Sequence, residues 1–160
     1  MSQASTPSST IQGYAPPSVT QFSVFLDNRV GKLHELLRVF EHSAVHLCAI
    51  SVHDASDHAV VRIVTSNSQE ARLVLARHNL PYAEQQLLVI ELDKTHSLER
   101  LCLYLLGAEL NIRFAYPLME CPSHSGTIAL AVDDVTLAGQ ILRRKEFKLL
   151  GESDLCRPGN

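Results

Sequence analysis

The chain has 160 residues, 46% of them hydrophobic, which is enough to build the packed core of one ordinary domain or of two small ones. Its formal net charge is −3, and acidic and basic residues are mixed along the sequence, so it lacks the basic stripe or patch expected of a nucleic-acid-binding protein. No apolar segment approaches the ~18 residues that a membrane-spanning helix requires, and the four cysteines form no C-x-x-C pair. We therefore expect a globular protein that has neither nucleic acid nor a membrane as its partner.

Residues 1–19 are rich in Ser, Thr, Pro and Gln, a composition that predicts a disordered tail. This tail has no basic stretch followed by an apolar run, so it does not resemble a secretory signal. The sequence therefore favours a cytoplasmic location.

The first half after the tail alternates short apolar runs with amphipathic stretches. The elements predicted there are a strand over 21–26, a helix over 32–42, strands over 45–53 and 58–65, a helix that is capped by Asn67 and extends to residue 78, and an extended run over 82–92. The last run is longer than a typical strand, so we interpret its first half as the final strand of one unit and its second half as the first strand of another.

The second half shows the same succession of patterns. Its predicted elements are a helix over 97–107, a strand over 110–118, a loop over 119–126, a strand over 127–132, a helix over 135–144 and a strand over 147–151. Each half therefore has the order β-α-β-β-α-β, which is typical of the ferredoxin-like α+β fold, a four-stranded antiparallel sheet with both helices on one face. The other face and the edges of such a sheet need cover, which favours pairing of the two halves or of two chains.

The amino-acid sequence itself repeats between these halves. One constant offset in numbering aligns the first helix and its turn with their counterparts, and a slightly larger offset aligns the second helix, so that two extra residues in the loop over 119–126 explain the change. Such repetition predicts two copies of one small domain, over residues 20–86 and 87–155. The aligned pairs are Asn28 with Asp93, Leu36 with Leu101, Phe40 with Leu105, His46 with Asn111 and Asn67 with Asp134.

The turn before the first helix carries a short motif. Asn28, Gly31 and Leu33 follow the pattern N-x-x-G-x-L, and Asn111-Ile112 begins the second strand of the second copy. With these residues and the repeated element order, residues 20–155 resemble a tandem pair of ACT domains, small regulatory modules that bind amino acids. The resemblance implies a free amino acid as the ligand and side-by-side pairing of the sheets, within the chain or across a homodimer. We expect no cofactor, no bound metal and no catalytic residue.

The chemistry of a free amino acid fits the first turn. Backbone N–H groups at a helix N-terminus suit a carboxylate because they lack intrahelical partners, and Gly31 lets the backbone approach a ligand closely. The residues that the resemblance places at the ligand are Asn28, Arg29, Val30, Gly31 and Leu33 in the first turn, His46 and Leu47 at the start of the next strand, and Asp93, His96 and Asn111 in the second copy. The alternative is a well-capped helix that binds nothing.

The second copy departs from the motif in its turn. Asp93 replaces the asparagine, and His96 occupies the position of the glycine, which removes the freedom of close backbone approach. We therefore expect the second copy to serve mainly as a pairing partner.

Other chemistry has weaker support in the sequence. His53 and His58 flank a predicted hairpin loop, but no H-E-x-x-H motif or matched Cys/His spacing is present. No G-x-S-x-G elbow, Walker loop or G-x-G-x-x-G motif is present either. Arg62 is the one charge within an apolar run, and we expect an ion pair for it at the edge or face of the sheet; the alternative is a contact across a dimer.

The sequence thus favours a non-catalytic regulatory protein that binds an amino acid. The alternative is a regulatory subunit of an amino-acid biosynthetic enzyme such as acetolactate synthase, whose small subunit also looks like an ACT protein. Against that alternative, the second half of this chain looks like another ACT copy, whereas that subunit has a distinct C-terminal domain.

Overall fold

The computed structural model describes residues 15–119 and 126–155, so the predicted tail through residue 14 and most of the predicted loop over 119–126 lie outside the described residues. The order β-α-β-β-α-β, predicted twice, is confirmed. No helix in the described ranges is long and apolar enough to cross a membrane. The elements are β1 (Val19–Asp27), α2 (Lys32–Glu41), β2 (Leu47–Ala55), β3 (His58–Thr65), α3 (Ser68–Arg77), β4 (Tyr82–Glu91), α4 (Leu98–Gly107), β5 (Ile112–Pro117), β6 (Thr127–Val132), α5 (Val135–Arg144), β7 (Lys148–Leu150) and the short 3₁₀ helix η1 (Glu152–Asp154).

Strand β4 belongs to both halves of the molecule. Its first part pairs with β1 as far as Leu87, which lies opposite Val19. From Leu88, opposite Leu130, it pairs with β6 on one side and with β7 on the other. This change of partner confirms the interpretation of the long extended run as two strands joined end to end. It also supports a domain boundary near this point, which stays a proposal; we call the parts before and after it the first and second modules.

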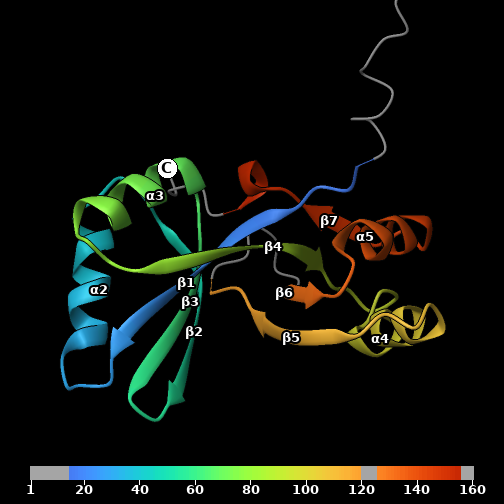
Figure 1. Cartoon of the computed structure of the whole chain (residues 1–160). Coiled ribbons are helices and arrows are strands. Elements are labelled where there is room, and N and C mark those ends of the chain that lie inside the picture. The colour runs from blue at the N-terminus through green and yellow to red at the C-terminus, as the bar shows by residue number, and fades with distance from the viewer. Residues whose placement is uncertain (1–14, 120–125, 156–160) are drawn as a thin grey trace, which may run out of the picture.

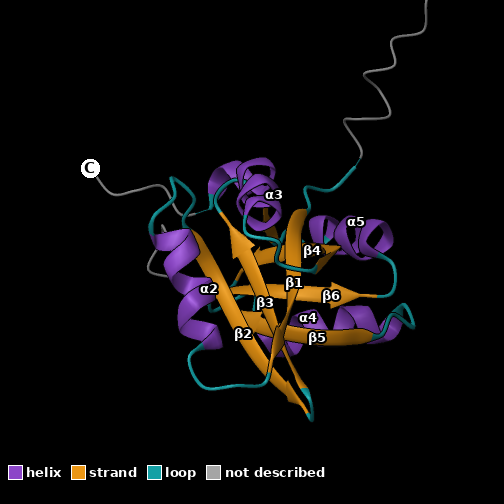
Figure 2. Ribbon diagram, turned by 60° about the vertical axis from the view of Figure 1, so that its left-hand side comes forward, coloured by secondary structure: helices purple, strands orange, loops and turns teal. Residues whose placement is uncertain are grey.

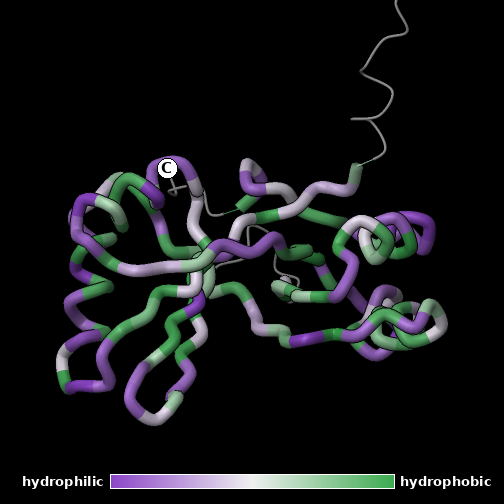
Figure 3. Tube along the Cα trace, viewed as in Figure 1, coloured by the Kyte–Doolittle hydropathy of each residue, from purple (hydrophilic) through white to green (hydrophobic). Residues whose placement is uncertain are grey.

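The helices cover the two outer faces of the molecule, and the strands lie between them (Figures 1 and 2). Helices α2 and α3 lie over the sheet of the first module, and Phe40 of α2 shares a buried cluster with Phe22 of β1. Helices α4 and α5 lie over the sheet of the second module, and Leu101 of α4 shares a buried cluster with Leu130 of β6. Each fully buried side chain of this kind contributes roughly 1.5–3 kcal/mol to folding. All four helices show both hydrophobic and hydrophilic residues along their length (Figure 3), as one-sided burial requires.

A third core lies between the two modules. Val64 and Cys48 of the first module share one buried cluster with Tyr116 and Ala129 of the second. The Tyr116 hydroxyl donates a hydrogen bond of 2.6 Å to Oε1 of Gln21 across this core. The open faces of the two sheets therefore cover each other, which meets the need for cover that the element order implied.

The expected side-by-side arrangement describes the hydrogen bonding but not the packing. In the described residues one seven-stranded sheet runs through both modules in the order β2-β3-β1-β4-β6-β5, with β7 beside β4. This sheet turns at β4 so that its two halves lie face to face, with the helices outermost (Figure 1). The expected ion pair of Arg62 is absent from the described residues; its guanidinium lies 4.1 Å from the centroid of the Phe114 ring, across the same contact.

The internal repeat extends to individual caps and core positions. Asn67 and Asp134 both cap a helix by accepting a hydrogen bond from the N–H three residues later, at 3.1 and 2.9 Å. One turn further along, Ala71 and Ala138 are both fully buried. The offset between Asn67 and Asp134 therefore relates α3 to α5 in the structure, as the sequence predicted.

The segment before β1 lies against α5. A Cβ atom at Gly139 would lie 2.4 Å from two ring carbons of Pro16, so the helix has room for this proline only because residue 139 is glycine. The guanidinium of Arg143 also donates to the carbonyl of Ala15 at 3.4 Å. The absence of a side chain at Gly139 thus lets α5 hold the segment that leads into β1.

Candidate ligand site at the first turn

Helix α2 begins without a side-chain cap. Its N-cap, Gly31, has φ of 90° and ψ of −13°, a left-handed conformation that glycine adopts readily. The N–H groups of Lys32 and Glu35 donate to backbone carbonyls. Those of Leu33 and His34 have no acceptor within the described residues. Because α3, α4 and α5 each have a side-chain cap, α2 is the helix whose N-terminal donors are left for an anion.

Asn28 holds this turn against the β2–β3 hairpin. Its side-chain amide donates to Oδ1 of Asp54 at 2.8 Å and to the carbonyl of Ser56 at 3.1 Å, and its own N–H donates to the carbonyl of Asp57 at 3.3 Å. The structure therefore gives Asn28 the role of positioning the turn. The residues Asp54 and Ser56 were not among the expected site residues, because sequence separation hides such contacts.

The rest of the turn is exposed. Arg29 forms an ion pair of 2.8 Å with Asp27 at the surface, where such pairs stabilise a protein by about 1 kcal/mol at most. Val30 is fully exposed, and Leu33 is 36% exposed on the first turn of α2. These side chains point away from any core and are available to a ligand or a partner.

A pocket of about 360 Å³ opens beside the turn, between the start of α2 and the segment that leads into β4. Its apolar lining includes Phe25, Leu80 and Pro81, and its charged lining includes Asp27, Lys32 and Glu35. The ammonium of Lys32 donates to the Glu35 carboxylate at 2.9 Å, and this hydrogen bond and the charge of Lys32 hold the pKa of Glu35 below its usual value. The pocket thus has both signs of charge and an apolar wall, a set that the motif alone did not reveal.

His46 and Leu47 do not lie at this turn, so the expectation that they lie close to it is wrong. Leu47 pairs with Thr65 at one end of β3, whereas Asp27 pairs with His58 at the other end. The cause is topological: α2 runs back along the sheet, so β2 starts at the end opposite to the one where β1 finishes. His46 is exposed, and its N–H donates to the hydroxyl of Ser66.

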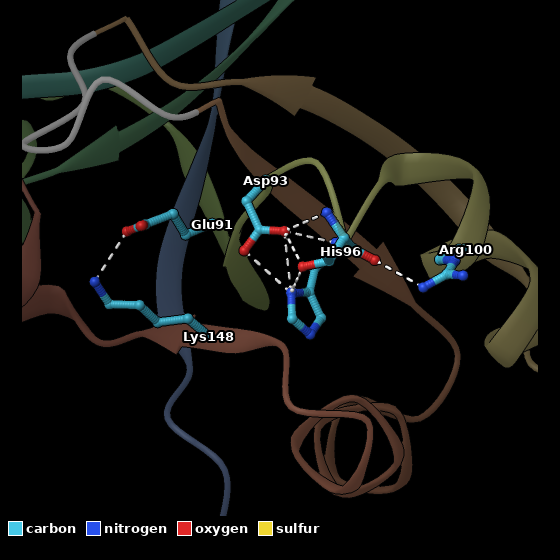
Figure 4. Close-up of polar contacts among 6 residues, drawn as sticks. Glu91, Asp93, His96, Arg100 and Lys148 are labelled. Atoms are coloured by element: carbon cyan, nitrogen blue, oxygen red, sulfur yellow. Dashed lines mark hydrogen bonds and ion pairs between the residues drawn. The ribbon is translucent and has the colours of Figure 1, made fainter.

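The corresponding turn of the second module is occupied by its own side chains (Figure 4). Oδ1 of Asp93 accepts from the N–H groups of Thr95 and His96, at 2.8 and 2.6 Å, and from the Thr95 hydroxyl. Hydrogen bonds from the Thr95 hydroxyl, and then from the His96 N–H and ring, hold the pKa of Asp93 well below its usual range. The His96 ring packs edge-on against Phe147, with 5.0 Å between centroids. Asp93 therefore takes donors that an anionic ligand would need.

Asn111 is separated from that turn for the same topological reason as His46. It precedes β5, where its N–H donates to Asp133 at 3.3 Å. The structure thus brings together the five expected residues of the first turn and, separately, Asp93 with His96. It leaves His46, Leu47 and Asn111 at other ends of the strands. Among the described residues, no group of three or more His, Cys, Asp or Glu side chains is arranged to hold a metal ion.

Solved structures of other proteins are similar to this chain in fold. A crystal structure of a protein from Bacteroides thetaiotaomicron superimposes with a TM-score of 0.78 at 19% identity, over 87% of this chain and 96% of that one. The ligand-free regulatory subunit of aspartate kinase from Thermus thermophilus superimposes with a TM-score of 0.54 at 8% identity, over 80% of this chain and 91% of that one. At these identities the similarity shows the fold alone.

No curated protein matches the chain in sequence. The sequence pattern of the ACT domain pair, however, matches residues 17–157 and so covers most of the chain. This match agrees with the repeated β-α-β-β-α-β order and with the shared strand β4. The chain therefore belongs to the ACT domain pair family.

Proposed function

We propose that this protein is a non-catalytic regulator that binds a free amino acid at the turn between β1 and α2. The observation that carries the proposal is the uncapped N-terminus of α2 beside a pocket with charges of both signs. A helix N-terminus whose donors are unused attracts a carboxylate. A pocket with acidic groups nearby can hold the ammonium of the same molecule.

Each residue of the turn has a role in this proposal. The N–H groups of Leu33 and His34, with the ammonium of Lys32, would bind the carboxylate, and Asp27 would accept from the ligand ammonium. Gly31 keeps the approach to the backbone open, since no atom lies within 4 Å of the place where its Cβ would be. Asn28 positions the turn, and the exposed Arg29 and Val30 are candidate contacts at the rim. We leave Asp93 and His96 out because the Asp93 carboxylate already accepts from the backbone N–H groups of its own turn, where a ligand carboxylate would bind.

The second module would contribute the surface through which two chains pair. On α4, Leu103 and Leu106 are 55% and 71% exposed beside the edge strand β5. The repeat places Arg38 and Glu41 at the same positions of the first module. Because the two helices otherwise share their apolar pattern, this patch is specific to the second module, and exposed apolar patches mark interaction surfaces.

The occupant that we propose for this patch is a second copy of the chain. Cys102 lies at the middle of α4 and is exposed, so a two-fold axis near it would place the two patches on each other.

A regulated enzyme is the second candidate partner. It is favoured by the similarity of fold to a protein that is itself a regulatory subunit of aspartate kinase. In that case the amino acid would act on a catalytic chain bound to this one. Copurification with an enzyme subunit would support this form of the function.

The proposal is tested by thermal shift of the purified protein against the common amino acids. A ligand that binds only the native state raises the melting temperature by mass action, so we expect a selective increase from one or a few of them. The Gly31→Ala variant should lose that increase because a Cβ at this φ strains the turn, at a cost on the order of 1 kcal/mol. Glu146→Val is the control, since it strains another residue with positive φ, 64°, in the second module. An unchanged response in Gly31→Ala would contradict the site.

A further inference from the structure

A groove of about 590 Å³ separates α2 from α3 in the first module. Its apolar lining includes Val39, Leu73 and Val74. The groove adjoins the pocket beside the first turn, because Glu35, Val39 and His78 line both. Gly31 lines neither, so the groove can be tested separately from the turn.

The space at the corresponding place in the second module is filled. Helix α4 packs against α5 there, and the rings of Tyr104 and Phe147 meet edge-on with 6.2 Å between centroids. The ammonium of Lys145 lies 5.0 Å from the centroid of the Tyr104 ring. Two aromatic rings and one cation therefore close the gap between the helices.

The internal repeat identifies the residues that stand at these positions in the first module. The offset that aligns α2 with α4 carries Val39 onto Tyr104, and the offset that aligns α3 with α5 carries Leu80 onto Phe147. The backbone supports the second pairing, because Leu80 and Phe147 each donate a 3.0 Å hydrogen bond to a leucine five residues earlier. In the first module the ring that fills the gap is thus replaced by the smaller side chain of Val39.

The charges around the groove favour an anionic group on whatever fills it. The groove is lined by six charged or titratable residues: Glu35, Arg38, His42, Glu70, Arg77 and His78. Glu35 already binds Lys32. The guanidinium groups of Arg38 and Arg77 have no carboxylate partner within 4.0 Å among the described residues, and the carboxylate of Glu70 offsets only one of these two charges. Arg38 is also specific to this module, because its counterpart is Leu103. Guanidinium groups beside an apolar surface suit a carboxylate that is joined to an apolar body.

We propose that the groove between α2 and α3 binds a small molecule with one aromatic ring and one carboxylate. Its ring takes the place that Tyr104 fills in the second module, against Val39, Val74 and His78. Its carboxylate binds Arg38 or Arg77. The site adjoins the pocket beside the first turn and shares Val39 and His78 with it. It does not use the backbone N–H groups of the turn, so it does not depend on the function proposed for that turn.

The experiment is an NMR titration of the full chain with 3-phenylpropanoate. We expect saturable shifts in the amides of α2 and α3, centred on Val39 and Val74, and weaker binding of 3-phenylpropanamide, which lacks the charge. Val39→Tyr, which supplies the missing ring, should weaken binding at least tenfold. Val52→Tyr, at an exposed position of β2, is the matched control and should bind as the wild type does.

Further variants keep the test decisive. Arg38→Gln with Arg77→Gln alters only the rim of the groove and should weaken binding of the acid severalfold without affecting that of the amide. Gly31→Ala should leave binding unchanged, which separates this site from the turn. Absence of saturable shifts, equal binding by Val39→Tyr and the wild type, or equal binding of the acid and the amide would overturn the proposal.

Discussion

A single glycine distinguishes the two turns that the repeat relates. Gly31 adopts φ of 90° and offers no side chain, so the donors at the start of α2 stay open. At the equivalent position His96 joins Asp93 and Thr95 in a network that uses the donors of the second turn. Two copies of one fold can therefore differ in binding through one or two residues at a helix N-terminus.

At the same scale, a buried hydrogen bond joins the modules. Burial raises the pKa of Tyr116 above its usual value. Its hydroxyl therefore stays protonated at neutral pH and donates to Gln21. Tyr116→Phe would leave the Gln21 acceptor buried without a donor, and we expect a loss of about 1–3 kcal/mol of unfolding free energy in urea denaturation.

Tyr104→Phe is the control for this measurement, because the Tyr104 hydroxyl makes no hydrogen bond with a described residue. It should change the free energy of unfolding by less than about 0.5 kcal/mol. Equal losses in the two variants would show that the contact between Tyr116 and Gln21 does not stabilise the fold.

At the scale of elements, helix α5 is shaped to receive the segment that precedes β1. Gly139 leaves room for Pro16. A glycine inside a helix costs stability, and here the contact with Pro16 is the packing reason for it. Gly139→Ala raises helix propensity by about 1 kcal/mol, but its Cβ must displace the proline. We expect little net change in stability together with faster backbone motion at Ala15 and Ser18, the two residues beside the prolines that carry an amide proton, measured by the ¹⁵N heteronuclear NOE.

Gly107→Ala provides the comparison for that helix. Gly107 ends α4, and nothing lies within 4 Å of the place where its Cβ would be. The substitution should therefore leave the segment before β1 unchanged. If Gly139→Ala also leaves the NOE of Ala15 and Ser18 unchanged, the contact with Pro16 does not hold this segment.

The sequence predicted the elements well because their signals are local. Asn67 and Asp134 are strong N-caps, and the apolar spacing in α2 and α4 is regular, so helix starts and core faces followed directly. The length of the run over 82–92 also revealed the shared strand. What the sequence could not show was non-local: the positions of His46 and Asn111 depend on strand direction, and the binding of Asn28 to Asp54 depends on a hairpin 26 residues away.

The face-to-face packing of the modules could not be predicted from the sequence either, because it is also non-local. Tyr116, Ala129 and Val64 follow the same alternation whether their sheet is covered by the other module or by a second chain. The groove between α2 and α3 could be found only in the structure, because its lining comes from two helices that strands β2 and β3 separate in the sequence.

At the scale of the whole molecule, we propose that the first module binds the ligands and that the second carries the pairing surface. If α4 and β5 form a two-fold contact, Leu103→Glu should place charges against each other in the interface and weaken the dimer at least tenfold, measured by sedimentation equilibrium. Leu73→Glu is a matched control, because Leu73 on α3 has the same 55% exposure as Leu103. A wild-type protein that stays monomeric, or equal weakening by both substitutions, would contradict this surface.

The most direct test of the central claim is a ¹H–¹⁵N chemical-shift map with the amino acid that raises the melting temperature most. If the turn before α2 is the site, the largest shifts fall on the amides of Leu33 and His34, whose N–H groups would meet the ligand, and on that of Gly31 next to them. Shifts centred on Asp93 and His96, with none at the start of α2, would contradict the assignment of the site to the first module.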